Sequence, residues 1–283
     1  MEPLFLDQAL ARRVELAEAQ AAACAAQATT RTRAGAAAVE RIAGGFAVYC
    51  GANSPVTQAI GLGLNGPVSV EEFRQLEDFY RGRKEAVRIE TCPLADPTLF
   101  EHLGKRGYHA TEFTNVMARR IRDGEEFPPC PKGVTVETVG ENRIDLWTLT
   151  VAQGFAENQP VSTEILDVMK MFALAPGIEC YLARVGGKPA GGGTLSLRDG
   201  LAGLFGASTL PAFRKRGVQS ALLRARLARG AAAGCGLAIC LAQPGSTSQR
   251  NILRNEFQVL YTRVKFEREY DDGIAGNSSR REG

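Results

Sequence analysis

Apolar residues recur along this chain with two periods, and the order in which the periods change predicts a mixed fold. Steps of three and four positions indicate amphipathic helices, whereas short apolar or alternating runs indicate strands. The helices that we expect cover residues 4–28, 70–80, 97–105, 143–154, 163–173, 217–230 and 246–255. The strands that we expect cover residues 46–50, 59–64, 86–90, 113–118, 134–139, 181–185, 190–197, 201–209, 237–242 and 257–266. The pattern therefore predicts an α/β (α+β) chain.

Polar residues mark the start of two of these helices. Ser69 is suited to cap one of them, because a serine side chain accepts hydrogen bonds from the free amides of a first turn. Glu71 and Glu72 follow it and suit the positive end of the helix. Asp96 precedes Pro97, which is favoured at a first helical position. We therefore expect helices to begin directly after Ser69 and Asp96.

The second half of the chain repeats the order of elements in the first half. Residues 60–118 and residues 204–266 both read as strand, loop, helix, strand, short helix and strand. A repeated order of this kind indicates a divergent internal duplication. The division that we expect is a first domain over 1–122, a linker over 123–132, a second domain over 133–270 and a disordered polar tail over 271–283.

The most informative stretch is residues 201–230 in the second copy. A small, apolar strand ends at Pro211, a loop with three consecutive basic residues follows, and a helix begins after Gly217. Free amides at a helix start carry partial positive charge and favour a phosphate or pyrophosphate, especially beside basic side chains. A solvated turn remains the alternative interpretation. Small residues at Gly203, Gly206 and Ala207 fit either a slim strand beside a ligand or close packing on a helix.

The loop and helix resemble the acetyl-CoA-binding motif of the GNAT acetyltransferase superfamily. The run Arg214-Lys215-Arg216-Gly217-Val218-Gln219 follows the pattern Arg/Gln-x-x-Gly-x-Gly/Ala, except that Gln219 replaces the second small residue. The resemblance implies two tandem GNAT-like domains, each with a mixed, mostly antiparallel sheet flanked by helices. It also implies acetyl-CoA as the co-substrate. The cofactor-binding positions that it implies are Ser208, Thr209, Leu210, Arg214, Lys215, Arg216, Gly217, Val218, Gln219, Ser220, Ser248 and Asn251.

In this family two parallel strands diverge and hold the pantetheine arm between them. By resemblance the diverging strands are 204–209 and 237–242, and the amides of residues 216–220 bind the pyrophosphate. An amide N–H near Ser208 is also a candidate to stabilise the oxyanion. Ser248 and Asn251 are candidates to contact the pantetheine, with helix capping as the plain alternative for Ser248.

The catalytic acid and base are less well marked. Many relatives protonate the leaving thiolate with a tyrosine, but Ile252 stands at that position. Tyr261 is a candidate substitute, against a structural tyrosine as the alternative. Glu157, between two helices of the second copy, is a candidate base, against a solvated loop acid as the alternative.

The first copy differs where the cofactor would bind. Residues 65–69, Asn-Gly-Pro-Val-Ser, replace the basic loop, and two glutamates follow. These carboxylates would repel a pyrophosphate and occupy the favourable field at the helix start. We therefore expect the first copy to be a degenerate domain that supports the second and shapes the substrate cleft.

Composition narrows the class of protein. The 283 residues carry a net charge of only +3, which does not indicate nucleic acid as the main partner. No apolar run is long enough to span a membrane, and the N-terminus lacks the order of a signal peptide. The seven cysteines form no CxxC pair and suggest reduced thiols in the cytoplasm. With only two histidines, a histidine-rich metal site is excluded, and we expect no metal.

The function that we expect is transfer of an acetyl group from acetyl-CoA to an amine of a small molecule or peptide by direct attack. A non-catalytic acyl-CoA-binding or scaffold protein is the alternative, favoured by Gln219 and by the missing tyrosine. A P-loop is disfavoured because no Gly-Lys-Ser/Thr follows the basic loop. The partners that we expect are acetyl-CoA and the acceptor amine, with no nucleic acid and no membrane. A homodimer is left open.

Overall fold

The computed structural model describes residues 4–32, 37–52 and 54–269, so the expected tail over 271–283 lies outside the described residues. The first half contains α1 (Gln8–Thr32), β1 (Ala38–Ile42), β2 (Gly45–Tyr49), β3 (Gln58–Ile60), α2 (Val70–Arg81), β4 (Val87–Thr91), α3 (Pro97–Lys105) and β5 (His109–Arg120). The second half starts with β6 (Val134–Thr138), a 3₁₀ turn (Glu141–Arg143), α4 (Ile144–Ala156), α5 (Thr163–Leu174), β7 (Ile178–Val185) and β8 (Lys188–Arg198). It ends with β9 (Leu201–Thr209), a 3₁₀ turn (Pro211–Phe213), α6 (Val218–Ala232), β10 (Leu237–Ala242), α7 (Thr247–Leu253) and β11 (Gln258–Arg268).

Elements with strong local signals agree with the sequence. Ser69 caps α2 in a capping box with Glu72, and Asp96 caps α3 ahead of Pro97, as predicted. The strand expected over 59–64 ends at Ile60, because the backbone turns at Gly61, where φ is +77°. Strand β1 was not predicted from the sequence. It is an edge strand that pairs with β2 alone.

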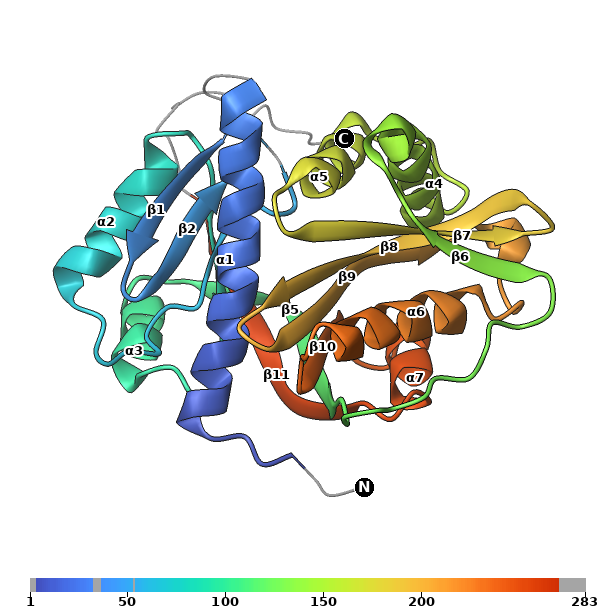
Figure 1. Cartoon of the computed structure of the whole chain (residues 1–283). Coiled ribbons are helices and arrows are strands. Elements are labelled where there is room, and N and C mark those ends of the chain that lie inside the picture. The colour runs from blue at the N-terminus through green and yellow to red at the C-terminus, as the bar shows by residue number, and fades with distance from the viewer. Residues whose placement is uncertain (1–3, 33–36, 53, 270–283) are drawn as a thin grey trace, which may run out of the picture.

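All strands of the described residues join in one eleven-stranded sheet with the order β1-β2-β3-β4-β11-β5-β10-β9-β8-β7-β6. Two neighbouring pairs are parallel, β3 with β4 and β9 with β10, and the other pairs are antiparallel. Each half thus has one parallel pair, followed by a short helix and a long last strand. The structure confirms a mixed, mostly antiparallel sheet flanked by helices (Figure 1).

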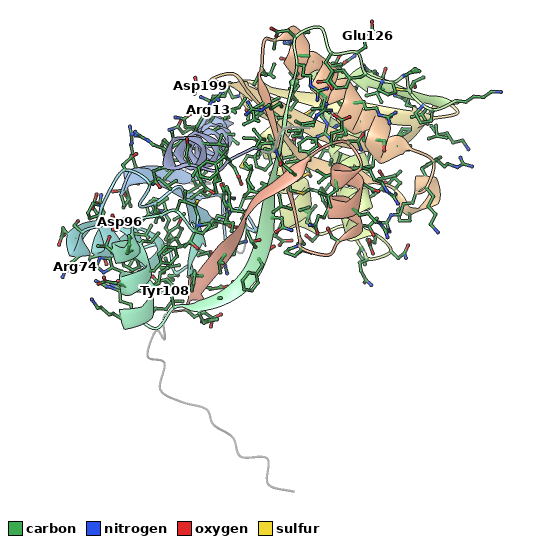
Figure 2. The ribbon with its side chains drawn as sticks, turned by 90° about the horizontal axis from the view of Figure 1, so that it is seen from below. Arg13, Arg74, Asp96, Tyr108, Glu126 and Asp199 are labelled. Carbon is green, nitrogen blue, oxygen red and sulfur yellow. The ribbon has the colours of Figure 1, made fainter. Side chains whose placement is uncertain are left out.

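The last strand of each half lies in the part of the sheet formed by the other half. Strand β5 pairs with β10, and β11 pairs with β4, so that β5 and β11 are neighbours at the centre of the sheet. Figure 2 shows these two long strands running side by side between the halves. Exchange of two whole strands makes the core of each half depend on the other half.

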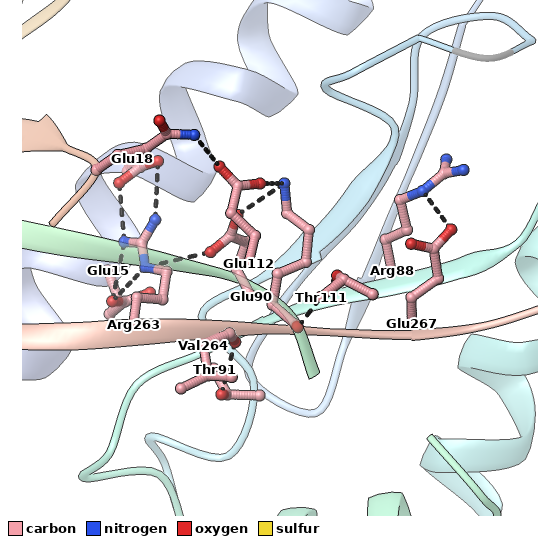
Figure 3. A network of polar contacts seen from close by, with 12 residues as sticks. Glu15, Glu18, Arg88, Glu90, Thr91, Thr111, Glu112, Arg263, Val264 and Glu267 are labelled. Carbon is pink, nitrogen blue, oxygen red and sulfur yellow. Dashed lines mark hydrogen bonds and ion pairs between the residues drawn. The ribbon is translucent and has the colours of Figure 1, made fainter. Parts of the chain in front are cut away.

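Helix α1 strengthens this connection through a buried polar network (Figure 3). The Arg263 guanidinium on β11 donates to Glu15 and Glu18 of α1 at 2.9–3.1 Å, and the Tyr261 hydroxyl donates to Glu15 at 2.6 Å. Burial raises the pKa of Glu15, although Arg263 opposes the shift. Burial alone would lower the pKa of Arg263, but Glu15 and Glu18 outweigh it and raise that pKa. Arg13, nearer the start of α1, donates to the carbonyl of Asp199 at 2.7 Å (Figure 2).

The helices cover both faces of the sheet in the second half. Helices α4 and α5 lie on one side of β6–β9, and α6 and α7 lie on the other (Figure 1). One core, around Trp147, packs under α4 and α5, and another joins α6 to Ala202 and Leu204. No helix of the described residues is long and apolar enough to cross a membrane.

Candidate functional site at the fork between β9 and β10

The two parallel strands of the second half, β9 and β10, diverge before either of them ends. Their pairing runs from Leu201 opposite Leu237 to Leu204 opposite Cys240. Beyond this point β9 continues for five residues, to Thr209, and β10 for two, to Ala242. The gap between the two strands is a V-shaped fork. The backbone groups that face it are not paired across the gap between β9 and β10 in the described residues. The family resemblance implies a divergence of these two strands.

A β-bulge bends β9 at the fork. Gly192 pairs with Ser208, and Thr194 pairs with Phe205, so one residue of β8 lies opposite two residues of β9. Gly206, in the bulge, has a φ of +56°, a conformation that favours glycine. The bulge therefore accounts for the glycine in this strand and for the direction in which β9 leaves β10.

A buried arginine, which the sequence analysis did not single out, holds the bulge from the side of α6. Arg226 is 1% exposed, and its guanidinium donates to the carbonyls of Thr194 at 2.9 Å and Phe205 at 3.4 Å. Its Nε donates to Leu222, one turn earlier. Burial lowers the pKa of Arg226 to about 10, and its Nη2 has no partner among the described residues. Gly193 leaves the space for this group, because a Cβ there would lie 2.9 Å from the guanidinium.

Three residues are expected to face the pantetheine, Ser208, Thr209 and Leu210, and they differ in the hydrogen bonds that they already make. The Leu210 amide already donates to the carbonyl of Ala190 at 2.9 Å. Because backbone groups alternate in direction along an antiparallel strand, the Thr209 N–H and C=O then point away from β8, toward the fork. The Ser208 hydroxyl donates to the Val151 carbonyl of α4 at 2.8 Å. Of the three, Thr209 is the residue whose backbone is directed into the fork.

The basic loop leads directly from β9 to the start of α6. Lys215 and Gly217 have φ values of +62° and +79°, so the chain turns sharply just before the helix. A Cβ on Gly217 would lie 2.7 Å from a ring carbon of Pro131, which adds a packing reason for glycine. Side chains cap α2, α3, α5 and α7, but none caps α6, whose first turn also contains no acid.

The basic side chains of this loop are exposed. Arg214 forms an ion pair with Glu157, at the end of α4, with 2.8 Å between Nη2 and Oε1. Glu157 has a φ of +57° and is itself exposed. The candidate base therefore lies against the basic loop. The corresponding position of the first half is different, because Ser69 and Glu72 occupy the free amides of α2.

The other candidates lie on α7 and β11. Ser248 is exposed and Asn251 is half-buried, while Ser246 provides the cap of α7. Ile252 is buried in the core beneath α6. Tyr261 is buried and bonded to Glu15, at the level of Val116 on β5 and hence of Leu241 on β10. With β5 between them, Tyr261 is two strand spacings, about 10 Å, from β10.

Comparisons with known proteins place this geometry in a family. The model of the acetyltransferase (GNAT) family matches residues 145–252, which span the fork, the basic loop and α6. No curated protein matches the sequence. A GCN5-related N-acetyltransferase from Kribbella flavida has a similar structure, with a TM-score of 0.64 at 17% identity over 91% of this chain and 95% of that one.

Two further solved structures resemble most of the chain. A GCN5-related N-acetyltransferase from Sphaerobacter thermophilus has a TM-score of 0.55 at 16% identity, covering 94% of each chain. A tandem GNAT protein from the clavulanic acid biosynthesis pathway has a TM-score of 0.57 at 13% identity, covering 87% of each chain. These structures show a shared fold. The resemblance inferred from the loop is confirmed, and the chain carries a GNAT acetyltransferase domain over residues 145–252.

Proposed function

We propose, from this GNAT domain, that the chain is an N-acetyltransferase that moves an acetyl group from acetyl-CoA to an amine of a small molecule or peptide. The observation that carries the proposal is the continuity of the fork, the basic loop and the uncapped start of α6. A thioester with a long polar arm and a pyrophosphate needs these three features in this order. We keep the division into domains over 1–122 and 133–270 as part of the proposal, and we expect a cytoplasmic enzyme.

The cofactor would bind along this path from the fork outward. The amides of residues 216–220 and the Arg214 and Lys215 side chains would hold the pyrophosphate. The backbone of Thr209 would bind the pantetheine as an added strand would. Asn251 would contact the arm from the side of α7. Gln219 is half-buried at the second position of α6, so its side chain has room to turn outward.

The reaction would be direct attack of the amine nitrogen on the thioester carbonyl carbon. The new carbon–nitrogen bond forms, the carbon–sulfur bond breaks, and CoA leaves as its thiol after taking up a proton. The proton lost by the attacking nitrogen passes to a base or to water. Glu157 and Tyr261 remain our candidates for base and acid. For Glu157 to accept a proton, its ion pair with Arg214 must open, which phosphate binding to Arg214 would favour.

The first experiment is calorimetric titration of the full chain with acetyl-CoA. We expect binding that Arg216→Glu abolishes, because the new carboxylate repels the pyrophosphate. Glu71→Arg is the matched control at the start of α2, and we expect it to leave the affinity unchanged. Absence of binding by the parent chain at millimolar acetyl-CoA would refute the proposal. Equal loss in both variants would refute a single cofactor site in the second half.

An acyl-CoA-binding or scaffold protein without catalysis is the second candidate. It is favoured by Ile252, which stands in the core where many relatives have a tyrosine. Release of CoA thiol in the presence of a panel of amines separates the two functions. Binding of acetyl-CoA with no amine-dependent thiol release across the panel would support the scaffold.

A further inference from the structure

A cavity of about 200 Å³ lies between α1 and the sheet, and the two halves of the chain form it jointly. Helix α1 forms one wall with Val14, Ala17 and Ala21, and β3 contributes Gln58 and Ile60. The other walls come from β8, β9, β10 and Phe172 of α5, which stacks edge-on against Phe205. No local sequence pattern connects Gln58 with Arg198.

Two polar groups in the cavity wall have no partner in the described residues. The Gln58 side-chain oxygen is buried without a hydrogen bond, in a residue that is 9% exposed. The Arg198 Nε, on β8, is also buried without an acceptor, although its Nη2 contacts the sulfur of Cys24 at 3.6 Å. An unsatisfied buried polar group costs free energy, so groups of this kind are usually satisfied by water or by a ligand. One group accepts a hydrogen bond and the other donates one.

The cavity also adjoins the fork. Leu204 and Cys240, the last residues paired across β9 and β10, are part of its lining, as are Phe205 and Leu241 just beyond them. A molecule in the cavity would therefore lie beside the point where the strands diverge. On the proposed function, this is where the thioester of the cofactor must meet its acceptor.

We infer that this cavity binds the acceptor, a small apolar primary amine that also carries a carbonyl or carboxylate oxygen. The inference rests on the proposed function. Arg198 would donate to that oxygen, and Gln58 would accept a hydrogen bond from an N–H of the ligand. A cavity of about 150 Å³ takes up benzene, so this cavity has room for one aromatic ring or a branched aliphatic chain.

The walls are largely apolar, and Glu18, the carboxylate in the lining, is paired with Arg263; the cavity therefore also affects the charge of a bound amine. Burial disfavours the charged ammonium form and lowers the pKa of the amine, which increases the fraction of neutral nucleophile. A strong protein base is then less necessary, in keeping with the exposed, ion-paired state of Glu157. The first copy, which lacks the basic loop, would thus contribute α1 and β3 to substrate binding.

The test compares amines that differ in one group, in thiol-release assays of the full chain with saturating acetyl-CoA. L-Phenylalanine and 2-phenylethylamine share a ring and differ in the carboxylate, while spermidine has no apolar body. We expect a KM for L-phenylalanine about tenfold below that for 2-phenylethylamine, the effect of one charge-assisted hydrogen bond. We expect the slowest turnover with spermidine.

Three variants examine the walls. Arg198→Met should remove the difference in KM between the two ring-bearing amines, and Gln58→Leu should raise both values. Gly203→Val should fill the cavity and raise both; a Cβ at Gly203 would make ordinary contacts of 3.7 Å or more. Arg120→Met, at an exposed position of β5, is the matched control for loss of a positive charge. None of these should alter the affinity for acetyl-CoA.

The outcomes separate this inference from the proposed function. If the chain acetylates amines but the cavity variants leave every KM unchanged, the cavity inference is wrong and the proposed function stands. A preference for spermidine, or for the amine without a carboxylate, also overturns it. If acetyl-CoA does not bind at all, the proposed function fails, and calorimetry with L-phenylalanine alone decides the cavity: heat that Arg198→Met removes supports a ligand site, and no heat refutes it.

Discussion

Replacement of Arg226 by methionine tests two effects of the buried guanidinium separately. One is its effect on the free energy of unfolding, and the other is its effect on acetyl-CoA binding at the fork. The guanidinium is buried with no carboxylate partner among the described residues, and it binds the carbonyls of Thr194 and Phe205, the pair of residues on β8 and β9 that directly adjoins the bulge. Methionine keeps much of the volume and the flexibility of the side chain but has no donor. We expect Arg226→Met to change the free energy of unfolding little and to weaken acetyl-CoA binding clearly.

Two stability terms of opposite sign act in Arg226→Met. The pKa of Arg226 falls from 12.5 to about 10 on burial, which corresponds to about 3 kcal/mol that folding loses by desolvating the cation. Methionine removes this cost but leaves the Thr194 carbonyl without its donor, a loss of about 1–3 kcal/mol. The Phe205 carbonyl keeps a hydrogen bond from the Thr194 hydroxyl at 2.7 Å. The terms nearly cancel, and we expect a net change within about 2 kcal/mol.

The functional effect does not cancel in this way. Without the guanidinium the bulge loses its connection to α6, and the fork can relax by a fraction of an ångström. Misplacement on that scale reduces rates by about 10- to 100-fold. Urea unfolding measures stability, and calorimetry and thiol release measure affinity and turnover. Arg229→Met is the matched control, since Arg229 is on the same helix but pairs with Glu179 at the surface.

Two results would refute this reasoning. A loss of more than about 4 kcal/mol of stability in Arg226→Met would show that the cation stabilises the fold, contrary to its burial cost. Unchanged affinity and turnover in a folded Arg226→Met variant would show that the bulge does not depend on the guanidinium. A similar loss of acetyl-CoA affinity in Arg229→Met would assign the effect to general positive charge on α6.

Two further predictions follow from the buried network and the loop. Arg263→Met should cost about 3–5 kcal/mol in urea unfolding, because Glu15 loses its cation and Glu90 keeps only Lys265. Burial raises the pKa values of both carboxyls and Arg263 lowers them, so without Arg263 they rise further and the folded variant binds more protons than the folded parent. The deficit should therefore be larger at pH 8 than at pH 5, and an equal deficit would contradict us. Gly217→Ala should lower the free energy of unfolding by about 1–3 kcal/mol, because φ at Gly217 is +79° and a Cβ there would collide with Pro131. The same change should weaken acetyl-CoA binding in calorimetry at least tenfold. Unaltered binding would contradict this prediction.

The sequence predicted the elements whose signals are local. Strands β9 and β10 have the predicted bounds, and α2 and α3 start at the predicted caps, because capping and periodicity involve residues within a few positions of each other. The loop before α6 was likewise recognisable from six consecutive residues. These local patterns were enough to indicate the resemblance to the family and the expected position of the cofactor.

Features that depend on distant residues were not predictable from one sequence. The exchange of β5 and β11 between the halves replaces one antiparallel neighbour by another, and it leaves the apolar pattern of each strand unchanged. Arg226 occurs in a helix with other arginines, and only the tertiary fold distinguishes the buried one. Gln58 and Arg198 are 140 positions apart and meet at the cavity because α1 crosses both halves.

The two halves differ at the start of the helix that follows their first parallel strand, α2 in one half and α6 in the other. In the second copy the amides in the first turn of α6 are free of side-chain caps. A basic loop and Gly217, a glycine in the left-handed region, come directly before that turn. In the first copy the side chains of Ser69 and Glu72 occupy the corresponding amides of α2, which stabilises that helix by about 1 kcal/mol. An anion would have to displace these caps and approach two carboxylates. On our proposal that only the second copy binds the cofactor, the first copy would gain a more stable helix, and α1 and β3 would be available as walls of the shared cavity.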